Sequence, residues 1–324
     1  MFNIFRSMLG ITLLAVSLTA FAENYPTKPI TLIVPSVPGG AADAVARLVA
    51  EGLGRELGKT VIVENRPSGA AIIGTQAVAR AAPDGYTLLL GLDAALVASP
   101  YLLAKAPYDA KRDFSAVGTL ATLQYVLVAS PAAKFHSVPE LVEQARGCCV
   151  GMLTYATGGE GSVHHLAMEL LQHDARMELK HVPYKAAPQG FTDLMGGHID
   201  LMFIAAGTAS GPVKAGKVQA LAVSGATKLN DLPTVPLLSD SVSGFVFESW
   251  FGLLAPAKTP SPVLKQLSSA LGKFLSTPDA RKKMQAIGVN AAEGDAAALQ
   301  QRIESDTQRY APIISKLKQT QAQP

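Results

Sequence analysis

Two glycine-rich segments combine small residues with an acid or a hydroxyl group. The first is Ser36-Val37-Pro38-Gly39-Gly40-Ala41-Ala42-Asp43, which follows the apolar run 31–34. The second is Thr157-Gly158-Gly159-Glu160-Gly161-Ser162, which follows the β-rich run 150–155. Turns of this kind at the start of a helix direct unpaired N–H groups and the positive end of the helix dipole at a bound anion. Both segments are therefore predicted to bind one small carboxylate.

Within these turns, the residue types indicate different roles. Gly39 and Gly40 allow a ligand to approach the backbone closely. Asp43 is expected to hold its own turn together from the first helical turn, in preference to contacting the ligand. Ser162 is expected to cap the helix that follows and to present its hydroxyl group to the ligand.

Three catalytic or metal-binding alternatives fit the sequence less well. Residues 159–164 resemble a dinucleotide fingerprint that lacks its third glycine. A hydrolase built on Ser162 and His165 would lack the G-x-S-x-G elbow. His165, Glu169 and His173 have the spacing of a shared metal site on a helix, but also that of an exposed polar helix face, which we favour. We therefore expect no catalytic residue, no metal and no cofactor, and hence no enzyme.

The elements that must position these residues alternate between strands and helices, which is typical of an α/β protein with parallel sheets. A helix is predicted over residues 41–57, where apolar residues recur at helical spacing and Gly58 ends the pattern. Ser261, Thr277 and Asp295 are predicted helix N-caps. Strands are predicted at 30–35, 60–64, 86–90, 123–129, 150–155, 199–205 and 218–224.

Residues 1–22 are predicted to be an export signal. Arg6 precedes the apolar run 8–21, and Ala20-Phe21-Ala22 fits a cleavage site near Ala22, so we expect a periplasmic protein. The net charge of +3 comes from scattered residues without a basic cluster, which argues against nucleic acid as a partner. No later apolar run is long enough to span a membrane. The neighbouring Cys148 and Cys149 are interpreted as free or occasionally oxidised thiols without a function.

Short segments along the chain carry a resemblance to the Bug family, the solute receptors of tripartite tricarboxylate transporters. They occur in the family's order over most of the sequence. These segments are Tyr25-Pro26-Thr27-Lys28-Pro29-Ile30, Pro38-Gly39-Gly40-Ala41-Ala42-Asp43, Val63-Glu64-Asn65-Arg66-Pro67, Ala82-Pro83-Asp84-Gly85-Tyr86-Thr87-Leu88, Gly161-Ser162-Val163-His164-His165-Leu166, Val182-Pro183-Tyr184-Lys185, Thr192-Asp193-Leu194-Met195-Gly196-Gly197, Asp200-Leu201-Met202-Phe203 and Ser249-Trp250-Phe251-Gly252-Leu253-Leu254-Ala255-Pro256.

The resemblance implies a type II periplasmic binding protein fold, in which two α/β lobes joined by a two-strand hinge close on a ligand. We expect lobe 1 at 23–122 and 246–324, and lobe 2 at 123–245. The implied function is capture of a small carboxylate, either an organic acid or an amino-acid-like metabolite, by a monomeric receptor. It would deliver the ligand to the membrane subunits of a tripartite transporter. The alternatives are a receptor that serves a two-component sensor and, less favoured, an exported enzyme.

Departures from the family pattern bear on the ligand. Ser36 stands where the family usually has Phe, and Asp93 where small hydroxyl residues are commoner. Ile204 and Ala205 replace a polar pair. If Asp93 faces the cleft, it would disfavour a second ligand carboxylate and favour an amine or a hydroxyl group; the alternative is a solvated helix cap. The full predicted ligand-binding set is Ser36, Val37, Pro38, Gly39, Gly40, Ala41, Asp43, Asp93, Thr157, Gly158, Gly159, Ser162, His165, Tyr184, Lys185, Ile204 and Ala205.

Overall fold

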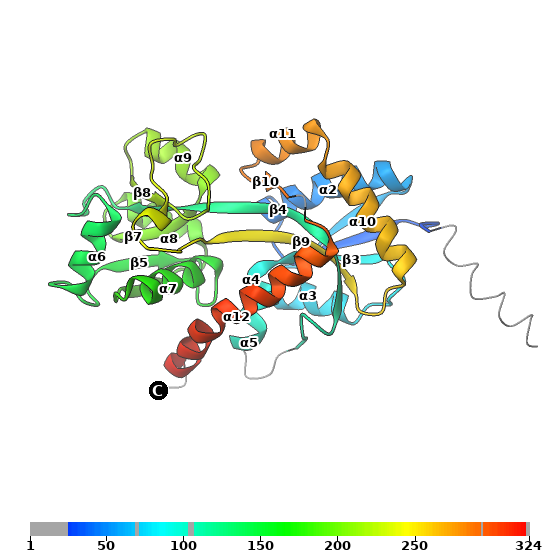
Figure 1. The fold of residues 1–324 in the computed structure, drawn as a ribbon, viewed down its shortest axis with the longest axis horizontal. Helices are drawn as coiled ribbons and strands as arrows, with labels where there is room; N and C mark the ends of the chain where they lie inside the picture. The colour runs from blue at the N-terminus through cyan, green and yellow to red at the C-terminus, as the bar shows by residue number, and fades with distance from the viewer. Residues whose placement is uncertain (1–24, 69–70, 103–106, 293, 322–324) are drawn as a thin grey trace, which may run out of the picture.

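Two α/β lobes lie side by side and are joined by long strands in this computed structural model (Figure 1). The structure describes residues 25–68, 71–102, 107–292 and 294–321. The predicted export signal at 1–22 lies outside these residues. Across the described part of the chain, no helix has both the length and the apolar character needed to cross a membrane.

The strands and helices alternate along most of the chain. The strands are β1 Ile30–Val34, β2 Val61–Asn65, β3 Thr87–Leu92, β4 Phe114–Ala129, β5 Thr154–Thr157, β6 Lys180–Pro183, β7 Leu201–Ala205, β8 Gln219–Val223, β9 Glu248–Pro256 and β10 Asn290–Ala291. The helices are α2 Ala41–Leu57, α3 Ile72–Ala79, α4 Asp93–Val97, α5 Ser99–Leu102, α6 Val138–Arg146, α7 Val163–Ala175, α8 Ala187–Met195, α9 Ala206–Lys214, α10 Ser261–Leu275, α11 Pro278–Ala286 and α12 Ala296–Gln321.

In lobe 1, the parallel strands β2, β1 and β3 are followed in the sheet by β9, which runs antiparallel to β3. Helix α2 buries Val45, Val49 and Leu53 against this sheet, and α10 packs on α2. The two helices approach so closely at Gly52 that a Cβ atom there would lie 2.3 Å from the Phe274 ring. A larger residue at this position would force the helices apart.

The hinge is made by β4 and by the chain around the start of β9. Residues 114–124 of β4 pair with β9, whereas Tyr125–Ala129 pair with β7 and β8 of lobe 2. Ser224 joins the two chain segments that make the hinge. Its hydroxyl group donates to the Phe247 carbonyl at 2.6 Å and accepts the Tyr125 N–H at 3.0 Å. The division into lobes after residues 122 and 245 stays a prediction.

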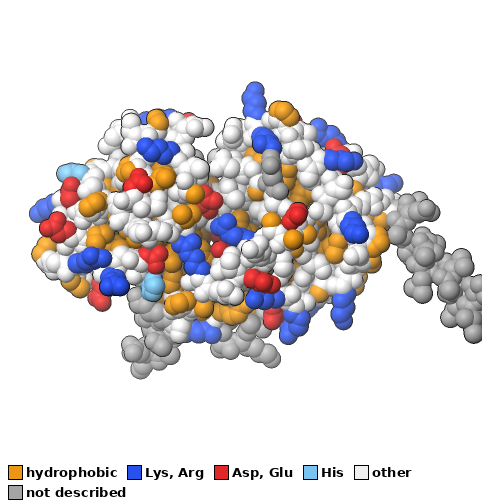
Figure 2. Space-filling view, viewed as in Figure 1, with side chains coloured by type: hydrophobic (Ala, Val, Ile, Leu, Met, Phe, Trp, Pro, Cys, Tyr) orange, Lys and Arg blue, Asp and Glu red, His pale blue; other side chains and the backbone are white. Residues whose placement is uncertain are grey.

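The C-terminal helix α12 contacts more of the molecule than the sequence indicated. It packs on β4, α4 and α5, and also on α7 of lobe 2, and it crosses the hinge in Figure 1. Basic and acidic side chains are interspersed over the face drawn in Figure 2, in line with the scattered charge of the sequence.

Several local predictions are confirmed and others need correction. Helix α2 ends at Gly58 in the left-handed conformation, as predicted, and Thr277 caps α11. Ser261 is not an N-cap, because it is already the first residue of α10. The strand predicted at 150–155 begins only at Thr154, since Gly151 has a positive φ within a turn. The short β6 and β10 and the hinge strand β9 were not predicted as strands.

Candidate functional site

A cavity of about 540 Å³ opens between the lobes and is lined by both of them. Lobe 1 contributes the ends of β1 and β3, the turn before α3 and part of β9, and lobe 2 contributes the β5–α7 turn and the start of α8. The lining residues are Pro35, Ser36, Val37, Ala42, Pro67, Ser68, Ala71, Leu92, Asp93, Ala94, Ala95, Ser99, Tyr125, Gly158, Glu160, Gly161, Ser162, Val163, His164, Ala187, Ser249 and Phe251. Their position beyond the carboxyl ends of parallel strands is where α/β proteins bind ligands.

Unpartnered polar atoms distinguish this cavity from the other hollows. Among the described residues, four buried side-chain polar atoms have no hydrogen-bond partner, and those of Ser36, Ser99 and His164 belong to residues that line this cavity. The fourth, Gln124 Oε1, belongs to a residue at a smaller interlobe groove of about 210 Å³. Because buried polar groups are normally paired, the grouping of these unpartnered atoms indicates a site for a polar ligand.

Two larger hollows do not have these properties. One of about 640 Å³ lies over α2 and β2 within lobe 1, and one of about 690 Å³ lies beside α6 within lobe 2. Neither is lined by residues of both lobes, and the residues that line them include none of the unpartnered atoms of the described chain. Size alone therefore does not select the candidate site.

The lobe 2 wall is formed by the start of α7. Ser162 caps this helix, as predicted, by accepting the His165 N–H at 3.4 Å. Helix α7 carries no acidic residue in its first turn, and Val163 and His164, whose amides are among those that a helix leaves unpaired, both line the cavity. The positive end of α7 is thus directed at the cavity with no acid in its first turn, although Glu160, in the turn before the helix, also lines the cavity.

The lobe 1 turn before α2 is closed by its own acid. The buried Asp43 carboxylate accepts the Gly39 N–H at 3.0 Å and bonds to Arg47 at 3.0 Å and to Asn65 Nδ2 at 3.0 Å. Hydrogen bonding to Arg47, followed by the Gly39 N–H, lowers the pKa of Asp43 to about 2. Asp43 therefore stabilises its turn, as interpreted from the sequence, and it does not line the cavity.

Asp93 lies at the boundary between the cavity and the hinge. Its carboxylate accepts the Ala94 N–H at 2.7 Å and bonds to the Ser249 hydroxyl group, which also meets Tyr125 Oη at 3.0 Å. Burial, opposed by these hydrogen bonds, raises the pKa of Asp93 to about 6. Asp93 lines the cavity, which is one of the two positions that the sequence left open.

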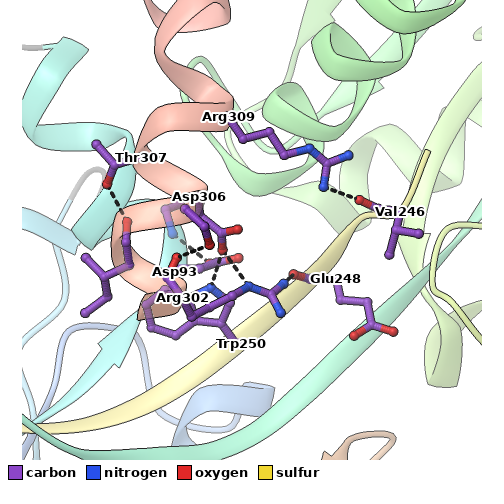
Figure 3. A network of polar contacts seen from close by, with 11 residues as sticks. Asp93, Val246, Glu248, Trp250, Arg302, Asp306, Thr307 and Arg309 are labelled. Atoms are coloured by element: carbon purple, nitrogen blue, oxygen red, sulfur yellow. Dashed lines mark hydrogen bonds and ion pairs between the residues drawn. The ribbon is translucent and has the colours of Figure 1, made fainter. Parts of the chain in front are cut away.

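Behind Asp93, a polar network ties α12 to the hinge strand (Figure 3). Trp250 Nε1 donates to Asp306 at 2.7 Å, and Arg302 Nε donates to the same carboxylate oxygen at 2.8 Å. Arg302 also donates to the Glu248 carbonyl at 3.2 Å. Arg302, whose charge acts on Asp93, is therefore engaged with Asp306 and the backbone. Trp250 is buried at the hinge.

The predicted site residues fall into three groups. Those that line the cavity are Ser36, Val37, Asp93, Gly158 and Ser162. A second group lies behind the lobe 2 turn: Thr157 accepts the Gly159 N–H at 3.2 Å, and His165 accepts the Gly161 N–H at 3.1 Å. The remaining residues do not line the cavity and are Pro38, Gly39, Gly40, Ala41, Asp43, Tyr184, Lys185, Ile204 and Ala205.

Some of the lining residues were not predicted from the sequence. Ser99, Tyr125, His164 and Ser249 reach the cavity from α5, β4, α7 and β9. Only His164 and Ser249 lay in segments that carried the family resemblance.

Tyr125 sits edge-on to His164, with 5.9 Å between the ring centres. Burial lowers the pKa of His164 to about 4, so this histidine is neutral at pH 7.

The helix face of His165, Glu169 and His173 is not the exposed polar face that we favoured. His165 and Glu169 are buried, where the His165 ring stacks on His181 at 4.0 Å and Glu169 accepts from Tyr155 Oη at 2.8 Å. Within the described chain, no group of three His, Cys, Asp or Glu side chains is placed to hold a metal ion. Cys148 and Cys149 are free thiols with Sγ atoms 2.7 Å apart.

Comparison with known proteins defines the class. The model of the tripartite tricarboxylate transporter family receptor matches residues 45–319. The UPF0065 protein in the tcbD-tcbE intergenic region of Pseudomonas sp. (strain P51) is 33% identical over 95% of this chain and 93% of its own length. The periplasmic binding protein BugD is 30% identical with a TM-score of 0.75, covering 90% of this chain and 98% of that one. An R. palustris protein solved with adipate is 28% identical with a TM-score of 0.78, covering 91% and 98%.

These similarities confirm the two-lobed binding-protein fold predicted from the sequence. The chain belongs to the tripartite tricarboxylate transporter family of receptors. Members of this family are periplasmic solute-binding receptors and not enzymes, so the cavity between the lobes is a candidate binding site.

Proposed function

We propose that this receptor captures a small carboxylate in the cavity between its lobes and presents it, in the closed form, to the membrane subunits of a tripartite transporter. We also propose that it acts as a monomer in the periplasm after cleavage near Ala22. The observation that carries the binding proposal is the grouping of unpartnered Ser36, Ser99 and His164 atoms around one cavity. The adipate solved with the R. palustris relative supports the carboxylate class.

The carboxylate would bind at the start of α7. The amides of the first turn and the Ser162 hydroxyl group offer donors there, and the helix dipole favours a negative charge. No Lys or Arg is among the described lining residues, so hydrogen bonds and the dipole would replace an ion pair. Hydrogen bonds to a charged group contribute about 1.5–3 kcal/mol each, so a few suffice for micromolar affinity, which needs about 8 kcal/mol.

Closure would follow from bonds made to both lobes at once. Ser36 and Ser99 belong to lobe 1, and Ser162 and His164 to lobe 2, so a ligand that bonds to both sets stabilises the closed arrangement. Such hinge motions occur on the microsecond to millisecond scale. A membrane subunit could then distinguish the closed form from the open one.

The test is a pair of matched substitutions measured by calorimetric titration. Carboxylates are first screened by thermal shift, and a bound ligand at about 100 times its Kd should add roughly 2.7 kcal/mol of stability. Ser162→Ala removes a helix cap at the cavity, and Ser137→Ala removes the cap of α6 with the same 3.4 Å geometry elsewhere in lobe 2. Both should cost about 1 kcal/mol of stability, but only Ser162→Ala should weaken binding, by about tenfold.

Two results would count against this proposal. If no carboxylate raises the melting temperature, the ligand class is wrong. If the Ser162 and Ser137 variants bind a ligand equally well, Ser162 is only a helix cap.

A further inference from the structure

The two walls of the cavity differ in how acids and helix N-termini are placed on them. The charged residues among the described lining are Asp93 in lobe 1 and Glu160 in lobe 2, and both are acidic. In lobe 2, α7 and α8 both begin at the cavity without an acid in their first turns. In lobe 1, the end of β3 places the Asp93 carboxylate directly at the cavity.

Asp93 retains capacity to accept hydrogen bonds. Its contacts within the protein are the Ala94 N–H and the Ser249 hydroxyl group. An ionised carboxylate has about four acceptor positions, so two further donors can be accommodated. The Arg302 guanidinium, whose charge acts on Asp93, bonds to Asp306 and to the Glu248 carbonyl.

A second anionic group placed near Asp93 would be unfavourable. Like charges within about 4–6 Å of each other oppose ionisation, and burial strengthens their repulsion. A hydrogen-bond donor in the same place would meet a partly desolvated acceptor. The cavity therefore suits a ligand with different ends.

Resting on the proposed function, we propose that the ligand is a monocarboxylate whose far end carries a hydrogen-bond donor, such as an ammonium or amide group. The carboxylate binds at the start of α7 in lobe 2, and the donor binds Asp93 in lobe 1. Asp93 is thus a specificity-determining residue that rejects dicarboxylates. Each end of such a ligand contacts a different lobe, so the same two contacts that select the ligand also favour closure.

The experiment compares probes of nearly equal length that differ at one end. Adipate carries two carboxylates, its monoamide replaces one carboxylate with an amide, and ε-aminocaproate replaces it with a CH2–NH3⁺ group. A shorter series of succinate, its monoamide and β-alanine covers a smaller ligand. Calorimetric titration at pH 7.5 should show that, within the series that binds, the donor-bearing probes bind at least about tenfold tighter than the dicarboxylate.

Asp93→Asn tests the residue itself, because it removes the charge and keeps an acceptor for the Ala94 N–H. This variant should lose affinity for the ammonium probe and gain affinity for the dicarboxylate, reducing the preference to about threefold or less. Asp295→Asn is the matched control: Asp295 also accepts an N–H at the start of a helix, at 2.9 Å from Ala298 N, and lies outside the cavity lining. It should leave the preference unchanged.

The outcomes separate the two proposals. A wild-type protein that binds dicarboxylates as tightly as the donor-bearing probes, or an Asp93→Asn variant with unchanged preference, overturns this inference and leaves the carboxylate receptor intact. Absence of binding by every carboxylate in both series overturns the proposed function as well. Since the wild-type comparison needs no variant, a poorly folded Asp93→Asn protein would not prevent the test.

Discussion

The glycine turns before α2 and before α7 are built alike. In lobe 1, Gly39, with φ +85°, donates its N–H to the side chain of Asp43 four residues later, at 3.0 Å. In lobe 2, Gly161, with φ +68°, donates its N–H to Nδ1 of His165, again four residues later, at 3.1 Å. Both turns therefore use a left-handed glycine and an acceptor in the first turn of the helix to fix their shape.

The charge of that acceptor differs. Asp43 is an anion that occupies the positive end of α2 and is held by Arg47. His165 accepts at Nδ1, so this nitrogen carries no proton and the ring is neutral. The dipole of α2 is thus compensated by an acid in its own first turn, whereas the first turn of α7 holds no acid. A glycine turn at a helix start is an anion site only when its own side chains leave the charge unbalanced.

The largest expected effect comes from giving α7 the acid that α2 has. His165→Asp would place a carboxylate at the start of α7, where it can accept the Gly161 N–H as Asp43 accepts that of Gly39. Because this internal anion would compensate the helix dipole and repel the ligand, we expect carboxylate affinity to fall by about a hundredfold or more. Calorimetric titration on folded protein measures the change.

His165→Asn is the control for this substitution. It has nearly the shape of the Asp variant and offers an amide oxygen to the Gly161 N–H, but it carries no charge. We expect it to keep affinity within about tenfold of wild type. If the Asn and Asp variants bind equally weakly, the loss reflects the packing of His165 on His181, and the electrostatic comparison of the two turns is wrong.

Sequence reasoning predicted the fold and some of the lining residues of each wall. The family resemblance predicted two lobes, and Ser162 and Gly158 of the predicted binding set line the cavity between them. The helix dipole argument was applied equally to both turns, however. Whether Asp43 points inward to Gly39 or outward to a ligand depends on the chain conformation and on Asn65, which lies on β2.

The rest of the site depends on contacts between distant parts of the chain. Ser249 meets Tyr125 across 124 residues of sequence, and together they place the Asp93 carboxylate at the cavity. Likewise, Trp250 reaches Asp306 on α12 only because that helix crosses the hinge. Neither pairing leaves a periodic or motif signal, so sequence patterns could not show whether Asp93 faced the ligand or the solvent.

A second substitution tests the closed turn of lobe 1. Asp43→Asn should lower the free energy of unfolding at pH 7 by about 2 kcal/mol, since the native pKa of about 2 lies below the ordinary value of 3.8 and each unit corresponds to about 1.4 kcal/mol. A lowered native pKa stabilises the fold above the unfolded pKa, and this contribution is lost as the pH falls from about 4 to 2. Urea unfolding of both proteins from pH 7 down to about pH 2 measures the difference in the free energy of unfolding.

Asp279→Asn is a matched control for Asp43. Asp279 also lies in the first turn of a helix and pairs with a base four residues later, Lys283 at 3.0 Å, but it is exposed. Its loss should change stability by less than about 1 kcal/mol. Carboxylate affinity should change less than about threefold in the Asp43 variant. A tenfold loss of carboxylate affinity would mean that the lobe 1 turn binds the ligand directly, and that Asp43 does more than close this turn.

The smallest expected effect is a gain in stability when Asp93 is replaced. Asp93 is the first residue of α4, and its carboxylate faces the cavity. Burial raises its native pKa to about 6, so this carboxyl group destabilises the fold as the pH rises from about 4 to 6. Asp93→Asn should therefore raise the free energy of unfolding at pH 7.5 by about 2 kcal/mol or less, and leave it unchanged at pH 4.

The charges of Asp306 and Arg302 on α12 also act on the Asp93 carboxylate. Thermal unfolding of Asp93→Asn in an Asp306→Asn background measures how much of the gain in stability depends on Asp306. An equal gain at both pH values would show that the change in packing, and not the buried charge, stabilises the variant. A gain confined to pH 7.5 would mean that the fold maintains this charge at a cost in stability, which is expected of an acid that serves ligand selection.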